Sequence, residues 1–322
     1  MLIMKIKLFT LFILTPILTY AQANKLYRKA IRATDLNEKI ELFNQVINLE
    51  PKNLNAYFYR GIAKNDLGDY SGAIVDYSKI LVYKPDADTY FNRGNSRYSL
   101  KDYEGAKQDY QKALDIDPDF IDALFSLATS KYDLNDYYGA IKDLNNVIET
   151  DPYHAKAYKL RATSYSALEK HEMALKDYSF LVLIYPNAET YFDRGLFYME
   201  LNHHEQALSD FTKSIRHDKK NPFTYFFRGI SNLHLAQYAN AVSDFSINTS
   251  FDSSDFDALI GLAIGYNKLN DLPNAQLNFE KAKKILAKTA KTKNTKALEF
   301  YADSYWYQKQ YYFFINGVKD LE

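Results

Sequence analysis

Histidines and carboxylates are the side chains that could carry acid–base or metal chemistry, because the 322-residue chain contains no cysteine. Among the six histidines only His203 and His204 are adjacent, and adjacent residues do not face each other on a helix. No HExxH motif, Gly-rich phosphate loop or nucleophile elbow occurs. The carboxylates recur at regular intervals instead of gathering in one segment. The sequence therefore predicts a non-catalytic protein with no catalytic residue, no cofactor and no metal site.

Arginine and aspartate form a polar pattern with a fixed spacing. Five arginines are each followed sixteen residues later by an aspartate: Arg60 and Asp76, Arg93 and Asp109, Arg161 and Asp177, Arg194 and Asp210, Arg228 and Asp244. Arginine binds a carboxylate in bidentate fashion, so we predict ion pairs that fix the register of neighbouring helices. The alternative is a row of arginines that faces a ligand. Leu127 and Leu262 stand where two further arginines would complete the pattern.

A repeated unit of 33 or 34 residues positions these groups. Small residues mark seven units, at Gly61, Gly94, Ala128, Ala162, Gly195, Gly229 and Ala263. We number these units repeats 1 to 7 in chain order. Twelve residues after each small residue stands an alanine, at Ala73, Ala106, Ala140, Ala174, Ala207, Ala241 and Ala275. Four residues further on stands a large apolar side chain, at Tyr77, Tyr110, Leu144, Tyr178, Phe211, Phe245 and Phe279.

The spacings within a repeat predict two helices. Residues four apart share one helical face, and no alternating pattern competes with them. Turns are expected between the helices, for example at residues 67–70, 100–103 and 134–137, where Gly, Asn and Asp recur. Prolines end the second helices at Pro51, Pro85, Pro118, Pro152 and Pro186. Each repeat is therefore expected to be an antiparallel helix pair, and the fold all-α.

These residues resemble the tetratricopeptide repeat, which has this order of aromatic, small, alanine and proline positions over 34 residues. The resemblance covers residues 54–289 and implies a right-handed superhelical solenoid of seven helix pairs. Residues 22–53 resemble a degenerate N-terminal helix pair, and residues 290–322 a divergent C-terminal capping pair. The tryptophan that the family carries early in each repeat is Tyr or Leu here, and two proline positions hold Lys219 and Ser253.

In this family the first helices line a concave groove that usually binds a peptide or a partner protein. The resemblance places the partner-binding positions at Asn55, Phe58, Phe91, Asn95, Tyr98, Phe125, Tyr132, Lys159, Phe192 and Phe226. Phenylalanine recurs at one position in five repeats, either packing between repeats or serving as a row of apolar anchors. The carboxylate clamp of some relatives is not reproduced, because Thr163 and Asp193 stand at its expected positions.

The first 21 residues resemble a secretory signal peptide. Lys5 and Lys7 precede an apolar stretch that is too short to span a bilayer, and the small residues Thr19 and Ala21 stand three and one positions before a cleavage after Ala21. We therefore expect an exported protein, either periplasmic or secreted. A lysine-rich stretch over residues 281–296 is compatible with contact to an anionic membrane surface, without a transmembrane helix.

Charge and composition narrow the function further. The chain has 40 basic and 40 acidic residues, so a nucleic-acid partner is not expected. The 29 tyrosines and 21 phenylalanines fit aromatic positions that recur in every repeat. We predict a non-catalytic scaffold in the cell envelope that binds a protein or peptide. The alternatives are a glycan-binding or enzymatic envelope protein that uses the concave aromatics for stacking, and a purely structural spacer.

Overall fold

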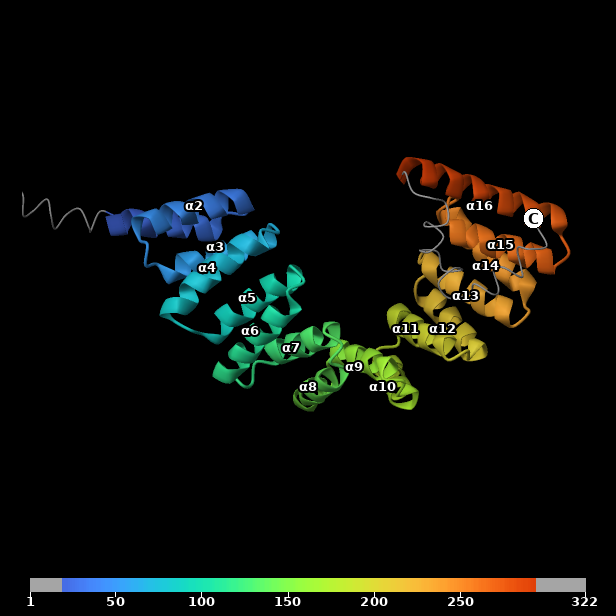
Figure 1. Ribbon diagram of the computed structural model, residues 1–322, viewed down its shortest axis with the longest axis horizontal. Helices are drawn as coiled ribbons and strands as arrows, with labels where there is room; N and C mark the ends of the chain where they lie inside the picture. The colour runs from blue at the N-terminus through green and yellow to red at the C-terminus, as the bar shows by residue number, and fades with distance from the viewer. Residues whose placement is uncertain (1–18, 294–322) are drawn as a thin grey trace, which may run out of the picture. The chain divides into compact units, whose positions relative to one another are not determined.

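The computed structural model describes the chain from residue 19 to residue 293, with side chains as far as residue 285. Most of the expected signal peptide, nearly all of the C-terminal capping pair and the aromatic residues within that pair lie outside the described residues. Every regular element over residues 19–293 is helical. A helix over residues 19–32 precedes α2 (Leu36–Leu49). The seven repeats follow as consecutive helix pairs (Figure 1).

The helices of the repeats are as follows: α3 (Leu54–Asp66) and α4 (Tyr70–Tyr83), α5 (Ala87–Ser99) and α6 (Tyr103–Ile116), α7 (Ile121–Asp133) and α8 (Tyr137–Thr150), α9 (Ala155–Ala167) and α10 (His171–Ile184), α11 (Ala188–Glu200) and α12 (His204–His217), α13 (Pro222–His234) and α14 (Tyr238–Phe251), α15 (Phe256–Lys268) and α16 (Leu272–Lys293). This order confirms the predicted all-α fold of antiparallel helix pairs. The chain divides into two compact units, one ending at Ala174 and the other beginning at Leu175.

The predicted helix ends are confirmed. Each of the helices α2, α4, α6, α8 and α10 ends two residues before the proline that was expected to stop it. Helices α12 and α14 end in the same register, although Lys219 and Ser253 replace the proline. The turns within repeats 1 to 3 place Gly68, Lys101 and Asn135 at positive φ, as the expected helix-ending turns require.

The small residues and alanines of the pattern bring the two helices of a repeat together. All seven alanines of the repeat pattern are fully buried. A Cβ added at Gly94 would lie 2.7 Å from the Tyr110 ring, so glycine lets the first helix approach the aromatic residue of the second. Within each unit, the apolar clusters lie between the helices of a repeat and against the next repeat, for example around Tyr110 and Ala123. This packing places the arginines and aspartates of the repeat pattern at equivalent positions in successive repeats.

Candidate functional site

Two of the predicted groove residues line a pocket in repeat 1. Asn55 is exposed and Phe58 is half-buried, and both lie on α3. Together with Tyr27, Lys84, Asp88 and neighbouring residues, they enclose about 280 Å³. An apolar ring edge, an exposed carboxylate and an ammonium group thus meet at one place.

The five phenylalanines of the predicted groove pack within their own repeats, and three also contact the next repeat: Phe91 lies 4.8 Å from Phe120, Phe125 lies 5.0 Å from His154 and Phe192 lies 5.8 Å from Phe227, between ring centroids. In four repeats the ring faces the aromatic residue of the second helix at centroid distances of 5.8–6.0 Å: Phe58 and Tyr77, Phe91 and Tyr110, Phe192 and Phe211, Phe226 and Phe245. Phe125 belongs to the cluster around Leu144 and also contacts His154. Phe226 is only 7% exposed, whereas the other four are half-buried. The packing interpretation therefore accounts for most of each ring and leaves an edge of four rings accessible.

The remaining predicted groove residues also make internal contacts. The amide oxygen of Asn95 accepts a hydrogen bond of 2.8 Å from the Tyr110 hydroxyl. The Tyr98 hydroxyl donates to Asp133 of the next repeat, and burial together with this bond raises the pKa of Tyr98. Tyr132 packs against Tyr137, and Lys159 is half-buried on α9. These side chains connect helices as well as lining the first-helix surface.

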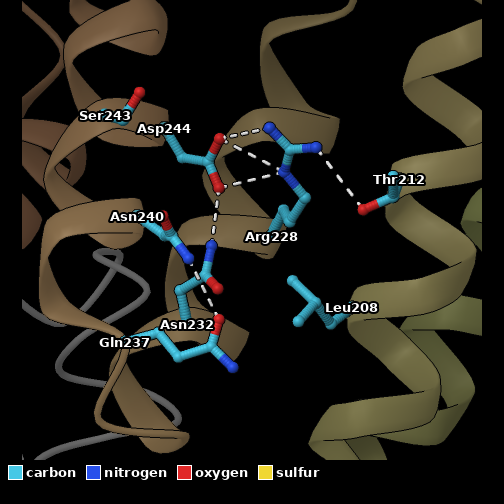
Figure 2. Close-up of a pocket in the computed structure, with 8 residues that line it drawn as sticks. All are labelled: Leu208, Thr212, Arg228, Asn232, Gln237, Asn240, Ser243 and Asp244. Atoms are coloured by element: carbon cyan, nitrogen blue, oxygen red, sulfur yellow. Dashed lines mark hydrogen bonds and ion pairs between the residues drawn. The ribbon is translucent and has the colours of Figure 1, made fainter.

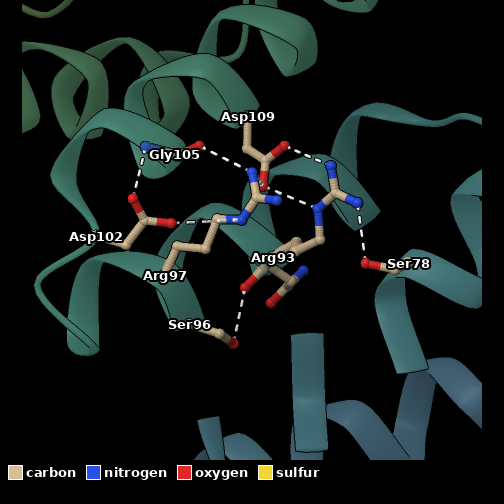
Figure 3. A network of polar contacts seen from close by, with 8 residues as sticks. Ser78, Arg93, Ser96, Arg97, Asp102, Gly105 and Asp109 are labelled. Atoms are coloured by element: carbon tan, nitrogen blue, oxygen red, sulfur yellow. Dashed lines mark hydrogen bonds and ion pairs between the residues drawn. The ribbon is translucent and has the colours of Figure 1, made fainter. Parts of the chain in front are cut away.

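The predicted arginine–aspartate pairs form within repeats 1, 2, 5 and 6. In repeat 2, Nε and Nη2 of Arg93 donate to the two carboxylate oxygens of Asp109 at 2.9 and 2.7 Å (Figure 3). Nη1 of Arg93 donates to Ser78 of repeat 1 at 3.0 Å. The same bidentate arrangement joins Arg60 to Asp76, Arg194 to Asp210 and Arg228 to Asp244. Each arginine therefore ties its own repeat together and contacts the helix that precedes the repeat.

Arg161 also makes a contact with the preceding repeat. Its Nη1 donates to Asn145 of repeat 3 at 2.7 Å. The hypothesis of structural ion pairs is thus confirmed in four repeats. Because the guanidinium groups are committed to buried carboxylates, the alternative of a row of ligand-facing arginines loses its basis there.

A second donor to the same aspartates was missed by the sequence analysis. Lys64 lies 2.9 Å from Asp76 and Arg97 lies 2.9 Å from Asp109. In repeat 3, where leucine replaces the arginine, Lys131 alone pairs with Asp143. The signal in the sequence is a cation four residues after the arginine position in these three repeats. In repeat 6 this position holds Asn232, which donates to Asp244 at 2.9 Å.

Two of the six histidines, His204 and His234, form a ring stack. His204 begins α12, at the position that Tyr70, Tyr103, Tyr137 and Tyr238 hold in other repeats, and its ring lies parallel to that of His234 at 4.0 Å. Burial, followed by the nearby His234, lowers the pKa of His204 to about 4. Across the part of the chain with described side chains, no three His, Cys, Asp or Glu side chains gather to hold a metal ion. In the same part, none of the helices is both long enough and apolar enough to cross a membrane.

Comparisons with known proteins identify the repeat. Models of the tetratricopeptide repeat match residues 87–120, 122–152 and 188–221. The C-terminal part of a TPR repeat-containing protein from Cytophaga hutchinsonii is 17% identical with a TM-score of 0.62, over 76% of this chain and 99% of that one. A tetratricopeptide repeat protein from Parabacteroides merdae is 19% identical with a TM-score of 0.58, over 76% and 98%. Comparison with curated proteins gives no match.

At these identities the solved structures show a shared fold and nothing further. The three sequence matches coincide with α5 and α6, α7 and α8, and α11 and α12. The chain therefore contains tetratricopeptide repeats.

Proposed function

We propose that this protein is a non-catalytic scaffold that binds a peptide or partner protein along its first helices. Tetratricopeptide repeat proteins are generally interaction scaffolds, which supports the coarser part of this proposal. The observation that carries the finer part is the pocket between α3 and α5, where Asn55 and Phe58 meet Asp88.

The pocket favours a particular kind of peptide side chain. Leu54, Phe58 and Ile80 supply apolar surface, while the Asp88 carboxylate is exposed at the start of α5. Asp86 is already used, because it accepts the backbone N–H of Thr89 at 2.9 Å as the N-cap of that helix. An apolar side chain beside a cationic residue would bury its surface against Phe58 and place its charge near Asp88.

A peptide-display selection against the full-length chain tests the proposal. Selected peptides should carry an apolar residue next to Lys or Arg, and Asp88→Lys should weaken their binding at least tenfold, which is about 1.4 kcal/mol. Glu149→Lys is the matched control, because Glu149 is an exposed carboxylate on the second helix α8. Equal effects of the two variants, or no selectable peptide, would count against this groove.

The proposed location is the cell envelope, and its support is the signal-like N-terminal sequence. Export with cleavage after Ala21 would give a mature protein that begins at Gln22. Terminal sequencing of the protein from fractionated cells measures this directly. An uncleaved chain in the cytosolic fraction would exclude export.

A further inference from the structure

A polar pocket of about 290 Å³ lies in repeat 6 and the helix before it. Leu208 and Thr212 of α12 form one side, while Gln237 and Asn240 lie on the other (Figure 2). Arg228 and Asn232 of α13 lie between them. The second helices α12 and α14 thus contribute most of this pocket, which separates it from the surface formed by the first helices.

The first special feature is Asn232. The corresponding residues of repeats 1 to 3 are Lys64, Arg97 and Lys131, which reach their aspartates with a charged end. Asn232 is shorter and uncharged, and its amide nitrogen donates to Asp244. Because an ionised carboxylate only accepts hydrogen bonds, the Asn232 oxygen must point away from Asp244. Asn232 is 2% exposed and this oxygen has no hydrogen-bond partner, so a buried acceptor is left for another group.

The second feature is the start of α14. In repeats 1 to 3 an aspartate caps the second helix, and a glycine three residues later donates to it, as Asp102 and Gly105 do at 3.0 Å. A Cβ on these glycines would meet the aspartate oxygen at 2.1–2.2 Å. Repeats 4, 5 and 6 each lack both residues, and repeat 6 carries Gln237 and Asn240 in their place.

The replacement gives up a stabilising cap, because Gln237 makes no side-chain bond to the helix terminus. Its amide oxygen instead accepts from Asn240 at 3.1 Å. Two carboxamides are therefore held at the pocket in place of a cap.

The charges of the pocket cancel. Arg228 and Asp244 form a bidentate pair, and no other charged residue lines the pocket. Arg228 also donates to Thr212 at 3.4 Å, and two of its five N–H groups take no part in these bonds. The pocket thus offers the Asn232 oxygen as an acceptor, and N–H groups of Arg228 and Gln237 as donors.

We propose that this pocket binds a primary carboxamide, the end of a glutamine or asparagine side chain on a peptide. Its NH₂ group donates to the Asn232 oxygen, and its oxygen accepts from Gln237 or Arg228. A carboxylate cannot donate to Asn232, and an ammonium would lie beside the Arg228 guanidinium. No aromatic ring lines the pocket, so a sugar would have no ring on which to stack. This contact lies beyond the proposed first-helix groove and does not depend on it.

Saturation-transfer NMR on the full-length chain tests the proposal with three probes: N-acetyl-glutamine methylamide, N-acetyl-glutamate methylamide and methyl glucoside. We expect saturable binding of the glutamine probe, with a dissociation constant on the order of 1 mM, and at least tenfold weaker binding of the other two. The Asp88→Lys variant should bind the glutamine probe unchanged, which distinguishes this site from the first-helix groove.

Two variants locate the site. Asn232→Lys introduces the residue that repeats 1 and 3 carry at this position, so the fold should be retained while binding of the glutamine probe falls at least tenfold. Ser243→Phe places a ring on an exposed position of the pocket wall and should have the same effect. Preference for the glutamate probe or the glucoside, or unchanged binding in both variants, would overturn the proposal.

Discussion

The stacked imidazoles of His204 and His234 should make the stability of repeats 5 and 6 depend on pH. The two rings are parallel with their centroids 4.0 Å apart; His204 lies on α12 and His234 on α13. The Nδ1 atom of His204 is buried and has no hydrogen-bond partner. A proton on His204 would therefore lie against a second imidazole with little water to solvate it.

The sign follows from the lowered pKa of His204. Between its ordinary value of 6.5 and its folded value of about 4, the unfolded chain binds the proton and the folded chain does not. Stability from this group is therefore complete above about pH 6.5, falls as the pH decreases, and levels off below about pH 4. The upper limit is about 3.4 kcal/mol, because one pKa unit corresponds to about 1.4 kcal/mol. Since His204 is partly exposed, solvent screening reduces this to about 1–2 kcal/mol.

Urea denaturation of the natural protein and the His204→Tyr variant at about pH 7.5 and about pH 4.5 measures the effect. Tyrosine is the residue that this turn position holds in repeats 1, 2, 3 and 6, so the variant should fold. The natural protein should lose about 1–2 kcal/mol more than the variant on acidification. Titrating groups that do not contact His204 are common to both proteins and cancel in the difference. The exposed neighbour His203, changed to Gln, is the control. An equal loss in the natural protein and His204→Tyr would refute the reasoning.

Two further predictions concern the packing of the repeats. Arg194→Met should destabilise the protein by about 3 kcal/mol and Arg93→Met by about 1–2 kcal/mol, because buried Asp109 keeps Arg97 whereas Asp210 keeps only Lys213, at 3.6 Å. A larger decrease in the urea denaturation midpoint for Arg93→Met than for Arg194→Met would contradict this. Ala140→Leu should cost about 1–3 kcal/mol by overpacking a fully buried contact, while Ala167→Leu at an exposed position should cost less than about 0.5 kcal/mol by the same measurement.

The fold was predictable because one physical constraint recurs in each repeat. A small residue, an alanine and a large apolar residue at fixed spacing leave only one way to pack two helices closely. The prolines and turn residues then fix the helix ends, and α12 and α14 end in register even without proline. Packing of the apolar face therefore determines these ends as much as the local breaker does.

The polar contacts were predictable only in part. Arg93 and Asp109 have a spacing that repeats in the sequence, so their pairing could be inferred. The contact of Arg93 with Ser78 could not, because the other four arginines use Asn44, Asn145, Ser179 and Thr212 in its place, so that three residue types occur at this position. What these partners share is an acceptor oxygen at a fixed place on the preceding second helix. The position of the acceptor on the preceding helix, and not its residue type, therefore determines this contact.

The two sites of the C-terminal unit arise at positions where the repeats differ from one another. His204 fits its turn position as an aromatic residue, and burial together with the nearby His234 lowers its pKa. Asn232, Gln237 and Asn240 lie at positions that each tolerate several residue types in the other repeats. Their significance appears when the contacts show that they replace a cation, a helix cap and a glycine around one pocket. In a repeat protein the regular positions specify the fold, and each repeat is a structural control for its neighbours. Replacing Gln237 with Asp and Asn240 with Gly should therefore restore the cap, stabilise α14 and remove two of the pocket's three carboxamides in a single variant.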